Sequence, residues 1–217
     1  MSHVFTDVKD AIRLDCNFEE YSIMKDGEDR RFNLYGAISS LDDDDDGYSY
    51  ASKVGRIVHA IMRYNREDRD DGIPVEGRKP IRLYINSPGG DVTEGFALVN
   101  AIEISKTPVY TINLGEWSSM SFLIGITGHK RFSLESATFL LHDGSSGAFG
   151  STSKVQDRVK FEERFEKEVV KKHVLKHSKM AEKTYDDLMR VEHYMLPEDA
   201  LKHGFIDEVV TDIDTIL

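Results

Sequence analysis

An alternation of short apolar runs and turns between Pro80 and His142 constrains the fold more than any other stretch of this chain. Two apolar runs, Ile81–Asn86 and Pro108–Asn113, are each followed by a glycine-containing turn, and a third, Ala137–Leu141, ends on His142. Helix-like segments separate the runs, which is typical of parallel strands joined by crossover helices. The pattern predicts an α/β fold in which two turns and a histidine follow buried strands, at the edge where loops of such folds carry chemistry.

Periodicity and turn residues predict the remaining elements. Apolar side chains recur at helical spacing over residues 54–62, and glycine and proline within 66–79 predict a loop after that helix. The first turn of the central stretch is expected at Ser87-Pro-Gly-Gly90 and the second at Gly115. Strands are also predicted at 31–38 and 205–210, and helices at 92–105, 119–127, 151–178, 183–190 and 197–203.

Residues 1–30 are polar with scattered apolar positions and predict no particular structure. The chain shows no internal repeat and no sign of a second domain. We therefore divide it into an N-terminal segment, 1–30, and a single domain, 31–217.

Composition argues against several classes of protein. The 217 residues are 40% hydrophobic, which is enough for a globular protein with a sizeable core. A net charge of −11 argues against a nucleic-acid surface and against binding to anionic membranes. No apolar run reaches membrane-spanning length, and the one cysteine, Cys16, allows no intrachain disulfide. The first residues lack the basic and apolar regions of a signal peptide, so we expect a cytoplasmic protein.

Ser119 is the leading candidate for a reactive residue. A serine hydroxyl is a weak nucleophile until a base accepts its proton, and His142, on a different predicted strand, is the candidate base. Acyl transfer also needs donors for the oxyanion, which Gly89, Gly90 and the N–H of Met120 are placed to supply. Each residue alone has a plainer interpretation: a helix N-cap, a turn or a surface histidine.

Four motifs, in order along the chain, resemble the proteolytic subunit of the Clp protease. They are Ser87-Pro-Gly-Gly90 after a strand, Ser119-Met120 opening a helix, Lys130-Arg-Phe132, and the histidine that ends the next strand. The resemblance covers roughly residues 30–210 and continues through Pro197-Glu-Asp-Ala-Leu-Lys-His-Gly-Phe-Ile-Asp-Glu-Val209. Single motifs of this kind are weak, whereas the ordered set is specific.

The resemblance implies a fold, an assembly and an activity. The fold is the stacked ββα spiral of the Clp peptidase and crotonase group, with the long helix at 151–178 protruding. The assembly is a homo-oligomer of heptameric rings stacked in pairs into a tetradecameric chamber. Inside it, a serine endopeptidase hydrolyses unfolded polypeptides that an AAA+ unfoldase delivers. The resemblance implies no cofactor or metal for cleavage, and no nucleic acid or membrane partner.

The resemblance also implies a role for each site residue. Ser119 is the nucleophile and His142 the base, while Ser118 is a rival one residue earlier. Glu192 stands where the family has the aspartate that orients the histidine. The N–H groups of Gly90 and Met120 are the expected oxyanion donors.

Substrate binding is expected on both sides of the nucleophile. Gly89 and Trp117 flank it, and the bulk of the indole is expected to narrow the substrate pocket. Residues 143–150 are glycine-rich, which fits a linker or an edge to which a peptide adds as a strand. The resemblance favours peptide binding, by Gly144, Ser145, Ser146 and Gly147.

Several positions depart from the family pattern. The spacing from Ser119 to His142 is slightly shorter than usual, Trp117 replaces a small residue, Asp143-Gly144 replaces Gln-Pro, and Glu192 replaces aspartate. The family's pore-lining N-terminal segment is not recognisable, and residues 66–79 resemble an insertion. Two alternatives therefore stay open: a catalytically silenced ring subunit with a scaffolding role, and a crotonase-type acyl-CoA enzyme, which would not need a Ser–His pair.

Two patterns typical of metal sites have plainer interpretations. The aspartate run Asp42–Asp46 lacks the alternating ligand spacing of a calcium loop, so we interpret it as a solvated loop. His173 and His177 stand at i, i+4 on a predicted helix, but no HExxH frame accompanies them. We interpret them as surface histidines.

Overall fold

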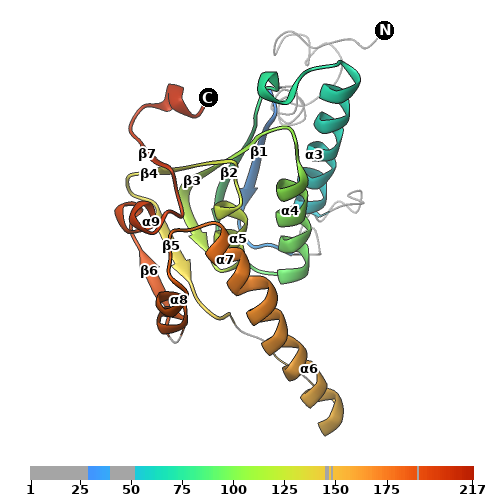
Figure 1. Ribbon diagram of the computed structural model, residues 1–217, viewed down its shortest axis with the longest axis vertical. Helices are drawn as coiled ribbons and strands as arrows, with labels where there is room; N and C mark the ends of the chain where they lie inside the picture. Colours follow the sequence, from blue (N-terminus) through green and yellow to red (C-terminus); the bar gives the residue numbers. More distant parts are fainter. Residues whose placement is uncertain (1–28, 40–51, 145–146, 148, 190) are drawn as a thin grey trace, which may run out of the picture.

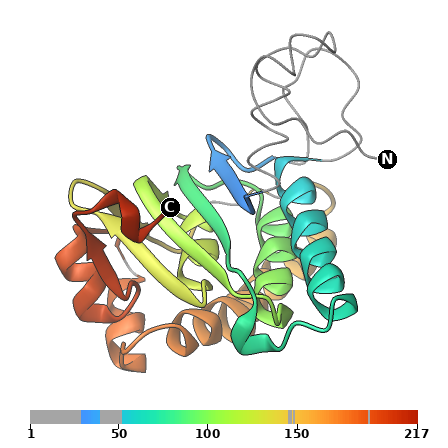
Figure 2. The ribbon, with the colours of Figure 1, turned by 90° about the horizontal axis from the view of Figure 1, so that it is seen from above.

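The computed structural model describes residues 29–39, 52–144, 147, 149–189 and 191–217. Within them, one sheet contains five parallel neighbours in spatial order: β1 (Arg31–Tyr35), β2 (Ile81–Ser87), β3 (Val109–Ser118), β4 (Lys130–Leu134) and β7 (Glu208–Val210). Two shorter strands complete it: β5 (Thr138–Leu141) pairs parallel with the end of β3, and β6 (His193–Met195) pairs antiparallel with β5. Figure 2 shows β1 and β7 at opposite ends of this sheet.

Helices connect the strands and pack at both ends of the sheet. They are α3 (Lys53–Asp70), α4 (Val92–Ile104), α5 (Met120–Ile126), α6 (Thr152–Phe165), α7 (Lys171–Lys176), α8 (Glu182–Leu188) and α9 (Pro197–His203), with short 3-10 turns at 75–77 and 213–215. Figure 1 shows α3 and α4 on one side of the strands, α8 and α9 on the other, and α6 extending away from the body. The α/β fold and the protruding helix that the sequence predicts are confirmed.

The predicted helix at 151–178 is nearly continuous but not uniform. A π-helical turn, Glu166–Val170, joins α6 to α7. All of α6 is exposed or only partly buried, whereas α7 contributes Val174 to the core. Among the described helices, none is both long and apolar enough to cross a membrane.

The burial of their side chains explains why the central strands are mostly apolar in sequence. Alternate residues of β2, including Ile81, Leu83 and Ile85, are fully buried, and every residue of α5 is buried against the strands. On the other face of β2, Tyr84 is buried, Arg82 is partly buried and Asn86 is exposed, so one face is covered completely and the other in part. The predicted strand boundaries at β2 and β5 are therefore close to the observed ones.

The predicted turn at Gly115 is wrong, because β3 continues through it to Ser118. The first half of β3 pairs with β4 and the second half with β5. A Cβ atom at Gly115 would lie 2.8 Å from Oδ1 of Asn86 on the neighbouring strand. The glycine thus allows a close side-chain approach within a strand and does not mark a turn.

The predicted loop beginning at residue 66 is also wrong at its start, because α3 runs on to Asp70. Asp68, which is only 1% exposed, holds this last part of the helix in place. Its carboxylate accepts two hydrogen bonds from Arg30, at 3.0 and 2.6 Å, and one from the Thr107 hydroxyl, at 2.7 Å. Met62, which the sequence placed on the apolar face, is exposed, while Tyr64 is buried. The aspartate run Asp42–Asp46 lies outside the described residues.

Asp68→Asn is expected to lower the free energy of unfolding by about 3 kcal/mol, because it leaves the Arg30 guanidinium without its buried partner. Burial alone would raise the pKa of Asp68, but hydrogen bonds from Arg30 and Thr107 and the Arg30 charge hold it below the usual value. The stabilisation is therefore complete above pH about 4 and is lost as the pH falls through the lowered folded-state pKa. Urea denaturation of both proteins at neutral and acidic pH measures this difference.

The matched control is Asp70→Asn on the same helix, where the side chain is exposed and pairs with Arg69. We expect it to change stability by less than about 1 kcal/mol. Equal losses for the two variants at neutral pH would contradict a special role for Asp68.

Candidate active site

Ser119 lies at the junction of β3 and α5 in a strained backbone conformation. Its φ is 57° and its ψ is −124°, a combination that few residues with a Cβ atom adopt. Its N–H donates to the Leu140 carbonyl at 3.0 Å, and its carbonyl accepts from the N–H of Phe122 at 3.0 Å. Ser119 occupies the N-cap position of α5, but within the described residues its hydroxyl forms no capping hydrogen bond, so its side chain does not act as a cap. Strain of this kind gathers at functional sites.

The neighbouring serines have structural partners. The Ser118 hydroxyl donates to Glu116 at 2.6 Å. The Ser121 hydroxyl oxygen accepts from the Ser118 N–H at 2.9 Å and lies 2.6 Å from the Ser87 carbonyl oxygen, to which it donates. These bonds fix the junction to the end of β2. Of the three serines, Ser119 is the one whose hydroxyl has no hydrogen-bond partner among the residues that the structure describes.

The Ser87-Pro-Gly-Gly90 turn is pressed against this junction. Gly89 has a φ of 92°, and a Cβ atom there would lie 2.6 Å from the Ser118 carbonyl oxygen and 2.8 Å from the Met120 nitrogen. Gly90 has a φ of 143° and forms a parallel bridge with Ile38, so a Cβ atom would lie 2.2 Å from the Ile38 oxygen. Both positions therefore require glycine.

The predicted oxyanion donors lie on either side of this contact. Met120 is the first residue of α5, so its N–H has no partner within the helix. The adjacent Gly90 continues the turn that touches Met120. The structure thus brings the glycine turn and the start of α5 together, as the sequence predicts.

His142 follows β5, which pairs with the end of β3 through Ser118 and Leu140. Ser119 and His142 therefore leave adjacent strands at the same edge of the sheet. No hydrogen bond joins their side chains in the described part of the chain. There, the Nε2 atom of His142 is buried and has no hydrogen-bond partner. In unliganded active sites such a bond often forms only when substrate binds.

Glu192 lies beside His142 because β6 pairs antiparallel with β5, Leu141 opposite His193. Its Oε1 atom is 4.0 Å from Nδ1 of His142, which is within ion-pair range but longer than a hydrogen bond. Its Oε2 atom accepts from the Tyr194 hydroxyl at 2.8 Å, and the side chain is 59% exposed.

Two other carboxylates near Glu192 in the sequence, those of Asp187 and Asp199, do not lie against His142. Asp199 accepts from the Leu196 N–H at 3.3 Å, at the start of α9. Asp187 belongs to α8. Neither forms an ion pair or hydrogen bond with His142 within the described residues, so Glu192 is the acid that the fold places next to it.

The side chain of Trp117 lies in the core and not at the surface beside Ser119. The side chain is 0% exposed and packs edge-on against Phe139, with ring centroids 5.5 Å apart. A Cβ atom at Gly125 would lie 2.4 Å from the indole, so the glycine makes room for it. The expectation that this ring narrows a substrate pocket is therefore wrong, because the ring belongs to the core beneath the Ser119 junction.

The predicted peptide-binding stretch is only partly described. Gly144, with a φ of 77°, and Gly147 are exposed, while Ser145 and Ser146 lie outside the described residues. None of the described residues from 143 to 150 is in a strand. Peptide binding by this stretch stays a prediction.

The interpretation of His173 and His177 as surface histidines is wrong. The side chain of His173 is 5% exposed and that of His177 is 18% exposed, and both approach Glu103 of α4. Burial lowers the pKa of each histidine. Burial alone would raise the pKa of Glu103, but hydrogen bonds from Lys176 and His177 lower it to about 2. The i, i+4 spacing of the two histidines is the sequence signal for this cluster. It cannot show that Glu103, on another helix, lies against them.

The chain matches a known protein family. The family model described as Clp protease matches residues 75–212, which is more than half of the chain. The matched segment contains the glycine turn, Ser119, His142 and Glu192. Together with the mixed sheet and its helices, the match supports the fold that the resemblance implied.

Proposed function

Because the chain belongs to the Clp protease family, we propose that it is a serine endopeptidase that hydrolyses peptide bonds of unfolded polypeptides inside an oligomeric chamber. The observation that carries this proposal is the strained backbone of Ser119, held against the glycine turn and beside the strand that leads to His142. A serine that only capped a helix would need neither the strain nor the close glycine contact.

In the proposed mechanism, the Ser119 oxygen attacks the scissile carbonyl carbon while Nε2 of His142 takes the hydroxyl proton. The N–H groups of Gly90 and Met120 donate to the oxyanion of the tetrahedral intermediate. His142 then gives the proton to the leaving amine, which departs as the C–N bond breaks. Water, deprotonated by His142, hydrolyses the acyl-enzyme and frees Ser119.

The burial of the His142 Nε2 atom suits this role. A buried nitrogen without a partner costs free energy, so we expect the Ser119 hydroxyl to reach Nε2 when substrate binds. Glu192 would stabilise the imidazolium that forms, through Nδ1. The substrate backbone would add as a strand along residues 143–147.

The proposed assembly is a homo-oligomer of stacked heptameric rings, to which an AAA+ unfoldase delivers substrate. Support comes from α6, which extends from the body (Figure 1). The side chains of Val159 and Phe161 on this helix are exposed. Apolar side chains on a protruding helix are suited to contact a second copy.

We expect light scattering of the purified protein to give a mass of at least seven chains. Phe161→Glu is expected to shift the distribution toward smaller species, because it places a charge on the apolar part of α6. Lys160→Glu, next to it on the same helix, is the control for an added negative charge. A mass equal to one chain for the wild type would rule out the chamber.

A fluorophosphonate probe tests the nucleophile directly, because it forms a covalent bond only with an activated serine. We expect the wild type to be labelled at Ser119, Ser118→Ala to be labelled as well, and Ser119→Ala to remain unlabelled. Intact-mass measurement after the reaction gives the stoichiometry. Equal labelling of wild type and Ser119→Ala would refute the assignment.

A catalytically silenced ring subunit is the second candidate. The 4.0 Å separation between His142 and Glu192 and the uncommitted Nε2 atom favour it, because an incomplete triad would show both. An unlabelled wild type that co-assembles with an active family member would select this function.

A further inference from the structure

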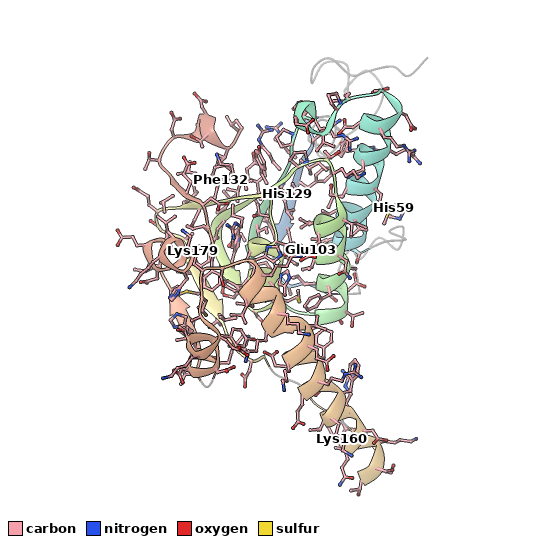
Figure 3. The ribbon with its side chains drawn as sticks, in the orientation of Figure 1. His59, Glu103, His129, Phe132, Lys160 and Lys179 are labelled. Carbon is pink, nitrogen blue, oxygen red and sulfur yellow. The ribbon has the colours of Figure 1, made fainter. Side chains whose placement is uncertain are left out.

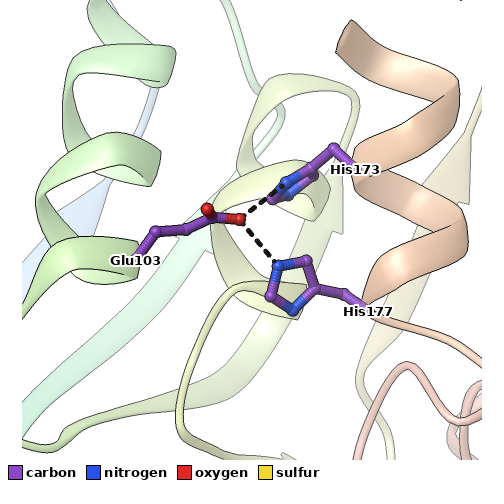
Figure 4. Close-up of side chains that lie close together, drawn as sticks. All are labelled: Glu103, His173 and His177. Atoms are coloured by element: carbon purple, nitrogen blue, oxygen red, sulfur yellow. Dashed lines mark hydrogen bonds and ion pairs between the residues drawn. The ribbon is translucent and has the colours of Figure 1, made fainter. Parts of the chain in front are cut away.

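Glu103, His173 and His177 form a side-chain cluster that the proposed peptidase mechanism does not use. Glu103 comes from the last turn of α4, His173 from α7, and His177 from the C-cap position directly after α7, at the base of the protruding helix. One ligand atom from each residue lies within 4.8 Å of the other two. Figure 4 shows the two rings pointing at the same carboxylate, and Figure 3 places Glu103 near the centre of the molecule, well away from Lys160 on α6.

The hydrogen bonds around His173 fix which of its nitrogens carries a hydrogen. Nε2 is 3.1 Å from the Leu123 carbonyl oxygen and 3.1 Å from the Thr127 hydroxyl oxygen. The Thr127 hydroxyl donates its own hydrogen to Leu123 at 2.7 Å, so both neighbours of Nε2 are acceptors. Nε2 must therefore be the protonated nitrogen, which leaves Nδ1 of a neutral ring as a bare lone pair.

That lone pair faces another acceptor. Nδ1 of His173 is 3.4 Å from Oε1 of Glu103, and the residue is only 6% exposed. Two acceptors facing each other repel unless a cation lies between them, and here the buried His173 faces the exposed Glu103.

The geometry points to a bound metal ion, and we propose that Glu103, His173 and His177 bind a divalent transition metal ion of the zinc class. Zinc bonds to imidazole nitrogen and carboxylate oxygen at about 2.1 Å, so ligand atoms in a tetrahedral site lie about 3.4 Å apart. The Glu103 oxygen is 3.4 Å from Nδ1 of His173 and 2.9 Å from Nε2 of His177. Small side-chain adjustments would bring all three to bonding distance.

The surroundings of the cluster match those of metal-binding residues. The other nitrogen of His173 is fixed by a backbone carbonyl, which is the usual outer partner of a metal-bound histidine. Lys176 bonds the second carboxylate oxygen, Oε2, at 2.7 Å and leaves Oε1 directed at the histidines. His177 is partly open to solvent, so a water molecule can complete the coordination.

A metal ion here would act as a clamp. It would join α4 to α7 and, through Leu123 and Thr127, hold the end of α5, the helix that Ser119 precedes. This inference does not depend on the proposed peptidase activity, since metal binding is measured on the protein alone.

The test is titration of untagged, chelator-treated full-length protein with Zn²⁺ by calorimetry and with Co²⁺ by visible absorption. We expect one ion per chain, a Co²⁺ spectrum typical of tetrahedral nitrogen and oxygen ligands, and a melting temperature that rises with Zn²⁺. Glu103→Gln and His177→Asn should each weaken binding by at least about tenfold, as losing one of three ligands implies.

Two variants serve as controls, and the outcomes are decisive. His59→Asn removes an exposed histidine on α3, away from the cluster in Figure 3, and Lys176→Met removes the charge next to Glu103. Both should still bind one ion. If Glu103→Gln does not fold, as judged by circular dichroism, His177→Asn at the more open edge decides. Absence of a one-to-one Zn²⁺ complex in the wild type, or unchanged affinity in His177→Asn, would overturn the proposal in favour of a metal-free ion-pair cluster.

Discussion

Ser119→Ala is expected to lower the turnover of a short fluorogenic peptide by a factor of about 10⁴ to 10⁶, the range found when a triad nucleophile is removed. The reason is specific to this site: of the three serines at the junction, only Ser119 has no hydrogen-bond partner for its hydroxyl in the described part of the chain. Steady-state kinetics with a peptide and with an unfolded protein measure the effect. We expect KM to change little, because a methyl group replaces a hydroxymethyl group without closing the site.

Ser118→Ala is the matched control. It removes a hydroxyl one residue away, whose partner is the partly buried Glu116. The expected cost is a stability loss of about 1 kcal/mol with turnover within about tenfold of wild type. If Ser118→Ala abolishes turnover and Ser119→Ala does not, the nucleophile is Ser118 and the family alignment at this position is shifted by one residue.

The edge of the sheet was predictable because its signals are local. Each buried strand appears in the sequence as an apolar run, so the residues that follow each strand can be identified. Parallel pairing brings the ends of these strands to the same edge of the sheet, which predicts that the Gly-Gly turn, Ser119 and His142 lie close together. The wrong prediction of a turn at Gly115 has a physical reason. Glycine permits both a turn and a close contact within a strand, and only the Asn86 side chain shows which applies.

The burial of polar side chains could not be predicted, because it depends on partners distant in sequence. Asp68 is buried through bonds to Arg30 and Thr107, and His173 through Leu123 and a carboxylate on α4. Neither set of contacts produces a recognisable pattern in the sequence, because the partners are far apart along the chain. Trp117 differs again. It stands two residues before Ser119 in the sequence, but the alternation of β3 turns its ring into the core.

Glu192→Gln is expected to lower turnover by a factor of about 10² to 10⁴ while leaving the assembly and probe accessibility of Ser119 intact. Replacing the triad carboxylate with an amide lowers turnover by about 10⁴ in serine proteases where that acid is buried and bonded to the histidine. Here the carboxylate is 59% exposed and 4.0 Å from Nδ1 of His142, so solvent weakens its effect on the imidazolium. The lower part of the range is therefore the expected result.

The Tyr194 hydroxyl helps to hold Glu192, since it donates to Oε2 at 2.8 Å and leaves Oε1 directed at His142. Tyr194→Phe should thus reduce turnover only slightly, by less than about tenfold, because it frees the carboxylate without removing its charge.

Asp187→Asn and Asp199→Asn are the matched charge controls for Glu192→Gln, and both should retain turnover close to that of wild type. Full activity in Glu192→Gln would show that His142 works without this acid. Loss of activity in Asp187→Asn or Asp199→Asn, with the fold preserved by circular dichroism, would transfer the orienting role to that residue. Such a transfer would require the segment from α8 to α9 to rearrange, because Asp199 accepts from the Leu196 N–H, whereas Glu192 directly precedes His193, the β6 residue paired with Leu141.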